Sequence, residues 1–153
     1  MDFSGAVTVV TGASSGFGRE IARALAARGA TIVAVARREE RLKELIEQLG
    51  GDPHYYVVTD VSDLSQVRAL ARAIEAKSGR IDILINNAGI ASKGLVAKTT
   101  SEELESVIRT NLISPIWTTR ELLSLLESAP RKSRTPLVVN VASMAGRIPT
   151  PKS

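Results

Sequence analysis

The amino-acid sequence predicts an α/β domain in which a parallel sheet is covered by helices on both faces. Short apolar runs alternate with amphipathic helical patterns along the 153-residue chain. The apolar runs are continuous, as is typical of strands that are buried on both sides. Right-handed crossovers between such strands give a doubly wound fold. The length suits one core, so we expect residues 1–153 to form a single domain.

The first two strand–helix units have the clearest patterns. Residues 6–10 (AVTVV) predict a strand, and the helical pattern that follows stops at Gly29. A second buried strand is predicted at 31–36. Residues 39–49 then place leucine or isoleucine at i, i+3, i+4 and i+7, which predicts an amphipathic helix closed by two glycines.

The third and fourth strands are predicted at 54–58 and 81–87. The segment between them predicts a helix, and either Ser62 or Asp63 can cap its first turn. Both strands are followed by polar residues, so a loop with side chains for binding is expected after each.

A long helical region and a fifth strand complete the chain. The residues Thr100 and Glu103 have the spacing of a capping box. The helical pattern runs from there to about Ser128, with a kink expected at Pro115. After a polar loop, residues 137–142 predict the fifth strand.

Composition and charge exclude several classes of protein. The net charge is 20 − 16 = +4, but the basic residues are dispersed and aromatic residues are only 3%, so we expect no nucleic-acid partner. No apolar run could span a membrane, and the N-terminus lacks the pattern of a signal peptide, so we expect a cytoplasmic protein without a membrane partner. The absence of cysteine excludes disulfides and thiolate metal sites, and we expect no metal.

The stretch TGASSGFG lies between the first predicted strand and its helix. Its glycines, Gly12, Gly16 and Gly18, differ in spacing from the commonest dinucleotide fingerprint. Glycines permit close approach of a ligand, and the helix N-terminus offers N–H groups and positive potential to a pyrophosphate. Ser14 and Ser15 add hydroxyl donors. A turn that needs only flexible residues would have the same pattern, so this stretch alone leaves both interpretations open.

The second predicted strand ends in Ala36, Arg37 and Arg38. In sheets of this class, ligands bind at the carboxyl ends of the strands, and an NAD site usually has an acidic residue here for the ribose 2′-hydroxyl. Arginine suits a 2′-phosphate instead, so NADP is favoured over NAD. The alternative is that both arginines simply begin the solvated face of the next helix.

The third and fourth strands end in polar and small residues. Asp60 can accept a hydrogen bond from an adenine amino group, or it can cap the following helix. The fourth strand leads into Asn87, Ala88 and Gly89, which allow a ribose or nicotinamide to lie against the backbone. An ordinary asparagine–glycine turn is the alternative for that segment.

Five motifs occur in one order: TGASSGFG, Asp60-Val61, NNAG, Asn111 in RTNLISP, and Ser143 in VNVASMAGR. Together they cover essentially the whole chain and resemble the classical short-chain dehydrogenase/reductase family. The resemblance implies a Rossmann-type sheet with strand order 3-2-1-4-5, to which the family adds further strands. It also implies NAD(P) at the glycine turn and hydride transfer between the nicotinamide and a small carbonyl or alcohol substrate.

The resemblance assigns site residues by position. Arg37 matches the position that the family associates with NADP. Ser143 matches the catalytic serine that polarises the substrate oxygen, and Asn111 matches the asparagine that orders a proton-relaying water. Without the resemblance, these two would be read as a strand-end hydroxyl and a polar helix position. The expected cofactor-binding residues are Gly12, Ser14, Ser15, Gly16, Phe17, Gly18, Arg37, Arg38, Asp60, Val61, Asn87, Ala88, Gly89 and Thr110.

The family's catalytic tyrosine and lysine are expected at about positions 156 and 160, whereas the sequence given ends at Ser153. The two tyrosines, Tyr55 and Tyr56, belong to the third predicted strand. We therefore expect a C-terminally truncated NAD(P)-binding Rossmann domain that lacks the family's last strands and is inactive alone. Two alternatives stay open: a non-catalytic nucleotide-binding or interaction module, and one half of a split enzyme.

Two features predict self-association. The fifth strand would form an exposed sheet edge, and the helix containing Ile113, Ile116 and Trp117 is strongly apolar. In the family, that helix region commonly contributes to a subunit interface, so the resemblance implies a homo-oligomer. The expected protein is thus an NADP(H)-dependent short-chain dehydrogenase/reductase that acts on a small carbonyl or alcohol.

Overall fold

The computed structural model describes residues 3–92, 95–129 and 135–144. Five parallel strands form one sheet in the order β3-β2-β1-β4-β5, which confirms the predicted strand order. The strands are β1 (Val7–Thr11), β2 (Thr31–Ala36), β3 (Tyr55–Val58), β4 (Ile83–Asn86) and β5 (Leu137–Asn140).

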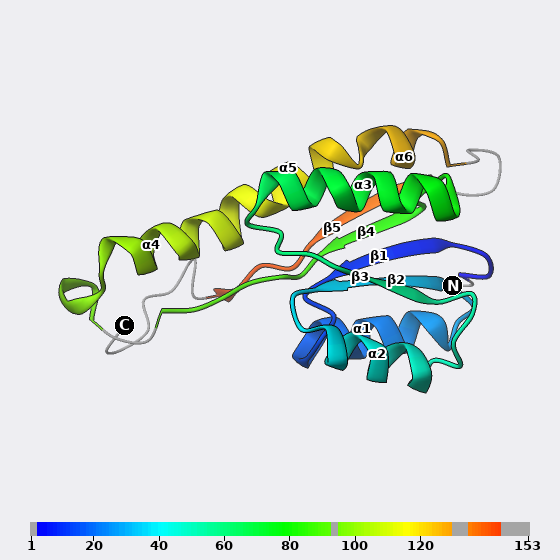
Figure 1. Cartoon of the computed structure of the whole chain (residues 1–153), viewed down its shortest axis with the longest axis horizontal. Helices are drawn as coiled ribbons and strands as arrows, with labels where there is room; N and C mark the ends of the chain where they lie inside the picture. Colours follow the sequence, from blue (N-terminus) through cyan, green and yellow to red (C-terminus); the bar gives the residue numbers. More distant parts are fainter. Residues whose placement is uncertain (1–2, 93–94, 130–134, 145–153) are drawn as a thin grey trace.

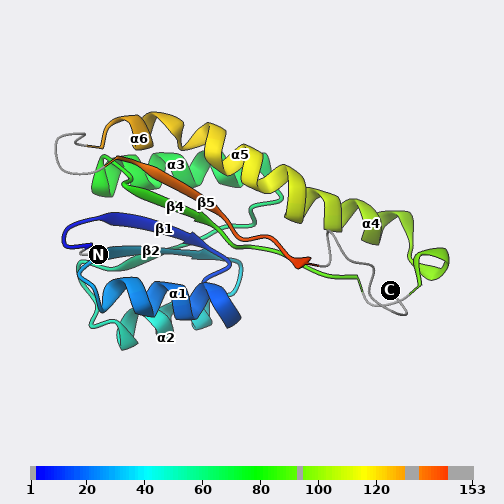
Figure 2. The same cartoon turned by 180° about the vertical axis from the view of Figure 1, so that it is seen from behind.

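Helices cover both faces of this sheet (Figure 1). α1 (Gly16–Ala26) and α2 (Glu39–Gln48) lie on one face. The opposite face is covered by α3, α5 and α6, while α4 extends beyond the carboxyl ends of the strands (Figure 2). The remaining helices are α3 (Leu64–Ser78), the short 3₁₀ helix η1 (Val96–Lys98), α4 (Ser101–Ile108), the π-helical segment η2 (Arg109–Ile113), α5 (Ser114–Glu121) and α6 (Leu123–Glu127).

Each face of the sheet has its own hydrophobic core. Side chains of a strand alternate between the two faces, so neighbouring residues of β1 and β2 enter different clusters. Val9 and Val33 pack on the side of α3, α5 and α6. Val10 and Ile32 pack on the side of α1 and α2. Because both faces are covered, all five residues of β1 are buried, as the continuous apolar run predicted.

The predicted caps are present at two helix N-termini. Asp63, not Ser62, caps α3, because its Oδ1 accepts a hydrogen bond from the backbone N of Ser65 at 2.8 Å. Thr100 and Glu103 form the predicted capping box of α4. These local side-chain bonds satisfy backbone N–H groups that have no partner within the helix.

The helical region around Pro115 is irregular, and the expected kink at Pro115 itself stays a prediction. The irregularity precedes it, as the π-helical segment η2, and Pro115 lies in the first turn of α5. Proline has no N–H to donate and is tolerated there. A second break, at Leu122, separates α5 from α6.

The fourth and fifth strands are shorter than predicted. β4 ends at Asn86 because the backbone N of Asn87 donates to the Oγ1 of Thr11, at 3.0 Å, instead of continuing the strand. β5 ends at Asn140, which is paired with Asn86 in the sheet. None of the helices in the described residues has the length and apolarity needed to cross a bilayer.

Candidate functional site

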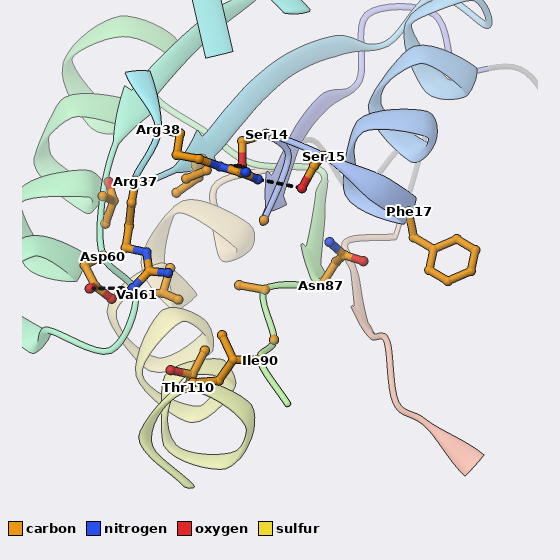
Figure 3. A pocket seen from close by; sticks show the side chains of 16 residues that line it. Ser14, Ser15, Phe17, Arg37, Arg38, Asp60, Val61, Asn87, Ile90 and Thr110 are labelled. Atoms are coloured by element: carbon orange, nitrogen blue, oxygen red, sulfur yellow. Dashed lines mark hydrogen bonds and ion pairs between the residues drawn. The ribbon is translucent and has the colours of Figure 1, made fainter. Parts of the chain in front are cut away.

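A cavity of about 330 Å³ lies at the carboxyl ends of β1, β2 and β4 (Figure 3). It adjoins the boundary between β1 and β4, where the strand order reverses, which is the usual ligand position in doubly wound sheets. The lining residues are Gly12, Ser14, Ser15, Phe17, Val35, Ala36, Arg37, Arg38, Thr59, Asp60, Val61, Asn87, Ala88, Gly89, Ile90 and Thr110.

The structure brings most of the predicted cofactor-binding residues together around this cavity. All of them line it except Gly16 and Gly18. The predicted list of cofactor-binding residues omits four residues that line the cavity, Val35, Ala36, Thr59 and Ile90, although each lies within two positions of a predicted residue. The described residues contain no group of three or more histidine, aspartate or glutamate side chains that could hold a metal ion.

Gly12 and Gly18 are required by close packing. At Gly12, where φ is +70°, a Cβ would lie 2.9 Å from the Cα of Ala88. At Gly18, a Cβ would overlap the side-chain amide of Asn87. Gly18 therefore lets α1 pack against the turn and the loop after β4, even though it does not line the cavity. Gly16 has a φ of +56° and open space around it, so its role is to permit the backbone turn.

Thr11 joins the glycine turn to the loop after β4. Its Oγ1 accepts hydrogen bonds from the backbone N of Asn87 and of Ala88, both at 3.0 Å. The amide Nδ2 of Asn87 donates to the backbone O of Thr11, also at 3.0 Å. Sequence reasoning did not assign a role to Thr11, and its only signal was a polar residue at the end of a buried strand.

The start of α1 is open to an anion. Ser15 is the N-cap residue, but its side chain makes no capping bond, and the first turn contains no acidic residue. The N-terminal N–H groups and the positive end of the helix dipole thus lack a side-chain partner, which suits a pyrophosphate. The ring of Phe17 is 79% exposed and points away from the arginines (Figure 3), so this residue contributes mainly backbone to the turn.

The two arginines after β2 reach the cavity with different partners. The Nε and Nη2 of Arg38 donate to the Oγ of Ser14, at 3.2 and 2.9 Å. Its Nη2 also donates to the Oγ of Ser15 at 2.6 Å. The Nη1 of Arg37 instead lies 3.6 Å from the Oδ2 of Asp60. Figure 3 shows both arginines over the same cavity.

Asp60 is an ionised group at the rim of the cavity. Its Oδ1 accepts hydrogen bonds from the backbone N of Ser62 at 2.9 Å and from its Oγ at 2.6 Å. Partial burial raises the pKa of Asp60, but the bonds from Ser62 and the charge of Arg37 outweigh it and hold the pKa below its usual value. The carboxylate therefore stays negative at neutral pH.

The two predicted catalytic residues do not line the cavity. Asn111 lies in η2, where its Oδ1 accepts from the backbone N of Ile90 at 2.9 Å and its Nδ2 donates to the O of Ile90 at 2.8 Å. Its amide thus holds the loop after β4. Ser143 lies just beyond β5 and is exposed. The catalytic roles of both residues stay predictions.

The tyrosines and the histidine are bound to other parts of the fold. Tyr55 and Tyr56 belong to β3 as predicted and do not line the cavity. The hydroxyl of Tyr55 bonds to the Oγ of Ser78 at 2.7 Å. His54, which was predicted to begin the third strand, lies directly before β3, and its Nδ1 accepts a hydrogen bond from the backbone N of Ile32 in β2 at 3.1 Å.

A family model described as short chain dehydrogenase matches residues 6–153. Among curated proteins, Dehydrogenase/reductase SDR family member 7B of Xenopus laevis is 38% identical, over 95% of this chain and 46% of its own length. The 3-oxoacyl-[acyl-carrier-protein] reductase FabG of Escherichia coli (strain K12) is 34% identical, over 95% of this chain and 58% of its own.

Solved structures of short-chain dehydrogenases and related reductases also match this chain. A short chain dehydrogenase/reductase from Burkholderia phymatum in complex with NAD has a TM-score of 0.89 and 32% identity, over 99% of this chain and 54% of that one. A 3-ketoacyl-(acyl-carrier-protein) reductase from Brucella melitensis complexed with NADH has a TM-score of 0.91 and 32% identity, over 99% and 62%. The chain spans about half the length of the curated relatives it matches.

Proposed function

This chain belongs to the short-chain dehydrogenase/reductase family, and on that basis we propose that the protein is an NADP(H)-dependent oxidoreductase. It would bind the cofactor in the cavity at the carboxyl ends of β1, β2 and β4 and act on a small carbonyl or alcohol. The observation that carries the choice of NADP is the pair of arginines, Arg37 and Arg38, that line the cavity after β2.

The residues of the cavity fit a dinucleotide. The glycine turn leaves no room for side chains beside Asn87 and Ala88, and the uncapped start of α1 offers N–H donors to a pyrophosphate. Val61, which keeps a small exposed fraction, would provide apolar surface for an adenine ring beside Asp60. The N–H donors suit the anionic pyrophosphate of such a cofactor, and the apolar surface suits its adenine ring.

The charges favour NADP over NAD. The solved relatives mentioned above hold NAD and NADH, but in this chain β2 ends in Ala36, without an acidic side chain for a 2′-hydroxyl. Asp60 is the only carboxylate among the lining residues, and it is already paired with Arg37. Two guanidinium groups and one carboxylate leave the lining with net positive charge, which suits a 2′-phosphate.

The bound nicotinamide would donate or accept the hydride. The chain's own residues would bind and orient: Thr11 and Asn87 fix the turn under the pyrophosphate, and Asn111 fixes Ile90 at the cavity wall. By family position, Ser143 would donate a hydrogen bond to the substrate oxygen, which gains negative charge as hydride arrives.

Binding without turnover is a second candidate function. In the described structure, Tyr55 and Tyr56 belong to β3 and neither lines the cavity. NADPH oxidation in the presence of a panel of aldehydes and ketones separates the two. Turnover supports the oxidoreductase, whereas tight binding without turnover supports the binding module, since loss of a general acid alone removes roughly 10²–10⁴-fold in rate.

The test of cofactor choice is calorimetric titration with NADP⁺ and NAD⁺. We expect NADP⁺ to bind at least about tenfold more tightly, because a phosphate paired with arginine forms charge-assisted bonds. The substitution Ala36→Asp should reverse the preference by adding a carboxylate that accepts from a 2′-hydroxyl and repels a phosphate. Ala69→Asp, on the exposed face of α3, is the matched control. Tighter binding of NAD⁺ by the unaltered chain would contradict the proposal.

A further inference from the structure

The cavity has a charged end and an uncharged end. The charged side chains among its lining residues are Arg37, Arg38 and Asp60, and Figure 3 shows them together on one side. The other lining residues are uncharged. In Figure 3, Asn87 lies between the arginines and the ring of Phe17, so this ring belongs to the uncharged end. A charged group of a substrate would find no ion-pair partner among the lining residues at this end.

The strand order places the uncharged end on the side of β5. Arg37 and Arg38 follow β2, and the sheet continues from β2 through β1 and β4 to β5. Because neighbouring strands are about 4.8 Å apart, the ends of β1 and β5 are separated by about 10 Å. The ring of Phe17 points away from the arginines and is therefore on the β5 side of the glycine turn. In Figure 3 the pale red segment around β5 runs on the same side of Asn87 as this ring.

Two close contacts connect the start of α1 to the end of β5 through the loop after β4. A Cβ on Gly18 would overlap the side-chain amide of Asn87, so α1 packs directly on this loop. The backbone O of Asn86 accepts a hydrogen bond from the backbone N of Val141 at 2.9 Å. Val139 packs in the hydrophobic cluster on the α1 side of the sheet, and alternation along the strand puts Val141 on the same face.

Large apolar side chains are exposed at both of these places. Phe17 is 79% exposed, Met144 is 72% exposed and Val141 is 42% exposed. Met144 directly follows Ser143, which by family position would donate a hydrogen bond to the substrate oxygen. Burial of exposed apolar surface against a ligand is favourable, and paired aromatic rings contribute beyond the area that they bury. An apolar substrate group beside Ser143 would cover these side chains.

We infer that the ring of Phe17 selects substrates whose reacting carbonyl carries an aromatic or other large apolar group, with Val141 and Met144 on the opposite side of that group. The inference rests on the proposed function and deepens it, because it names the substrate class of the same site. The carbonyl oxygen would lie at Ser143, and the apolar group would extend from it across the end of β4 to Phe17. The backbone of Phe17 thus serves the glycine turn, and its side chain determines specificity.

The probes are acetophenone and acetone, two methyl ketones that differ in a phenyl or a methyl group. With NADP⁺ bound there is no hydride to transfer, so ketone binding is measured without turnover. The Kd of each ketone is obtained by chemical-shift titration of the 153-residue chain saturated with NADP⁺. We define the ratio of the Kd of acetone to that of acetophenone as the phenyl preference. It should be at least about tenfold in the unaltered chain.

Substitutions of Phe17 test the role of the ring. Phe17→Ala should lower the phenyl preference by about 5- to 20-fold, or to unity if the initial preference is smaller, because it removes apolar contact area and ring packing. Phe17→Tyr should keep the preference within about threefold, because it retains the ring. Leu123→Ala is the matched control, since Leu123 is 47% exposed on α6 and does not line the cavity. Its phenyl preference should equal that of the unaltered chain.

Two further measurements separate a substrate contact from other roles. Met144→Gln, which replaces an apolar side chain by a polar one of similar length, should lower the phenyl preference by about 3- to 10-fold. The Kd of NADP⁺ should change by less than about twofold in Phe17→Ala, because backbone N–H groups rather than the ring suit the pyrophosphate. Weaker binding of NADP⁺ with an unchanged phenyl preference would make the ring a cofactor contact and overturn the inference.

The outcomes distinguish this inference from the proposed function. If the unaltered chain does not bind NADP⁺, the proposed function fails and the inference fails with it. If NADP⁺ binds but neither ketone binds, or both bind equally, the inference alone is overturned. The same holds if Phe17→Ala keeps the phenyl preference. Loss of the preference in Phe17→Ala, with retention in Phe17→Tyr and Leu123→Ala, supports the inference.

Discussion

Thr8 and Thr118 are both almost completely buried, at 0% and 1% exposure, but among the described residues only the hydroxyl of Thr118 has a hydrogen-bond partner. The Oγ1 of Thr118 donates to the Oδ1 of Asn86 at 2.7 Å and so ties α5 to β4. The Oγ1 of Thr8 has no hydrogen-bond partner among the described residues. A buried hydroxyl without a partner costs free energy, whereas a paired one contributes modestly to stability.

We therefore predict opposite effects for the same substitution. Thr118→Val should lower the free energy of unfolding by about 1–3 kcal/mol, because it removes the hydroxyl that donates a hydrogen bond to the side-chain Oδ1 of Asn86. Thr8→Val should leave it unchanged or raise it by up to about 1 kcal/mol. Urea denaturation followed by circular dichroism measures both, and each variant is the control for the other. Equal losses would show that shape, not hydrogen bonding, dominates at both positions.

The residues of the site differ in how much of their role could be predicted from the sequence. The glycine turn and the arginines after β2 belong to short motifs, so their positions could be predicted. The contacts that give them their roles could not be predicted, because they join residues far apart in the chain. Thr11 and Asn87 are 76 positions apart, and Arg38 and Ser14 are 24 apart. Only the folded sheet brings such side chains together.

At the scale of elements, the distinction between local patterns and long-range contacts also explains which helix and strand boundaries could be predicted. The inner strands β1, β2 and β4 are buried on both faces, and the caps are made by residues within one turn, so both leave local patterns in the sequence. The π-helical segment η2 leaves no such local pattern in the sequence. It coincides with Asn111, whose amide is bound to Ile90, 21 positions earlier, and it directly precedes the turn that contains Pro115. An irregularity could be expected near the proline, but the hydrogen bonds between Asn111 and Ile90 join this segment to another loop and leave no local pattern in the sequence.

The contact between β2 and the residue directly before β3 is predicted to depend on pH through His54. Its Nδ1 accepts from the backbone N of Ile32, which requires a neutral ring. Burial lowers the pKa of His54, against a smaller opposite effect of Asp52. Because the pKa is lower in the folded state, the contribution to stability is fully present above the unfolded value of about 6.5 and is lost as pH falls through the folded value.

The measurement is urea denaturation at about pH 7.5 and 5.5, above most carboxyl titrations. His54 is the only histidine in the sequence, so the window isolates it from other imidazoles. The unaltered chain should lose more stability between these values than the non-titrating variant His54→Gln. An identical loss in both chains would refute the assignment to His54.

At the scale of the whole molecule, α4, η2 and α5 present an exposed apolar face. Leu104, Ile108, Leu112 and Ile116 recur every four residues along it and are 39–60% exposed. Two of these residues, Leu104 and Ile108, also line a groove of about 470 Å³ together with Trp117. Monomeric proteins rarely expose contiguous apolar surface of this kind. We propose that a second copy of the chain covers this α4–α5 face in a symmetric dimer.

The dimer should be visible as concentration-dependent mass in size-exclusion chromatography with light scattering. Ile108→Glu should shift the protein to the monomer, because it places a carboxylate on each side of the two-fold axis in apolar surroundings. Val58→Glu, at a similarly exposed apolar position on β3, should leave the mass unchanged.

The competing route to association is pairing through β5. This strand is at the edge of the described sheet, and its Leu137 is 50% exposed. β5 is only four residues long, so it offers few backbone bonds compared with the area of the helical face. If Leu137→Lys rather than Ile108→Glu dissociates the protein, the strand edge is the interface and the α4–α5 face is not.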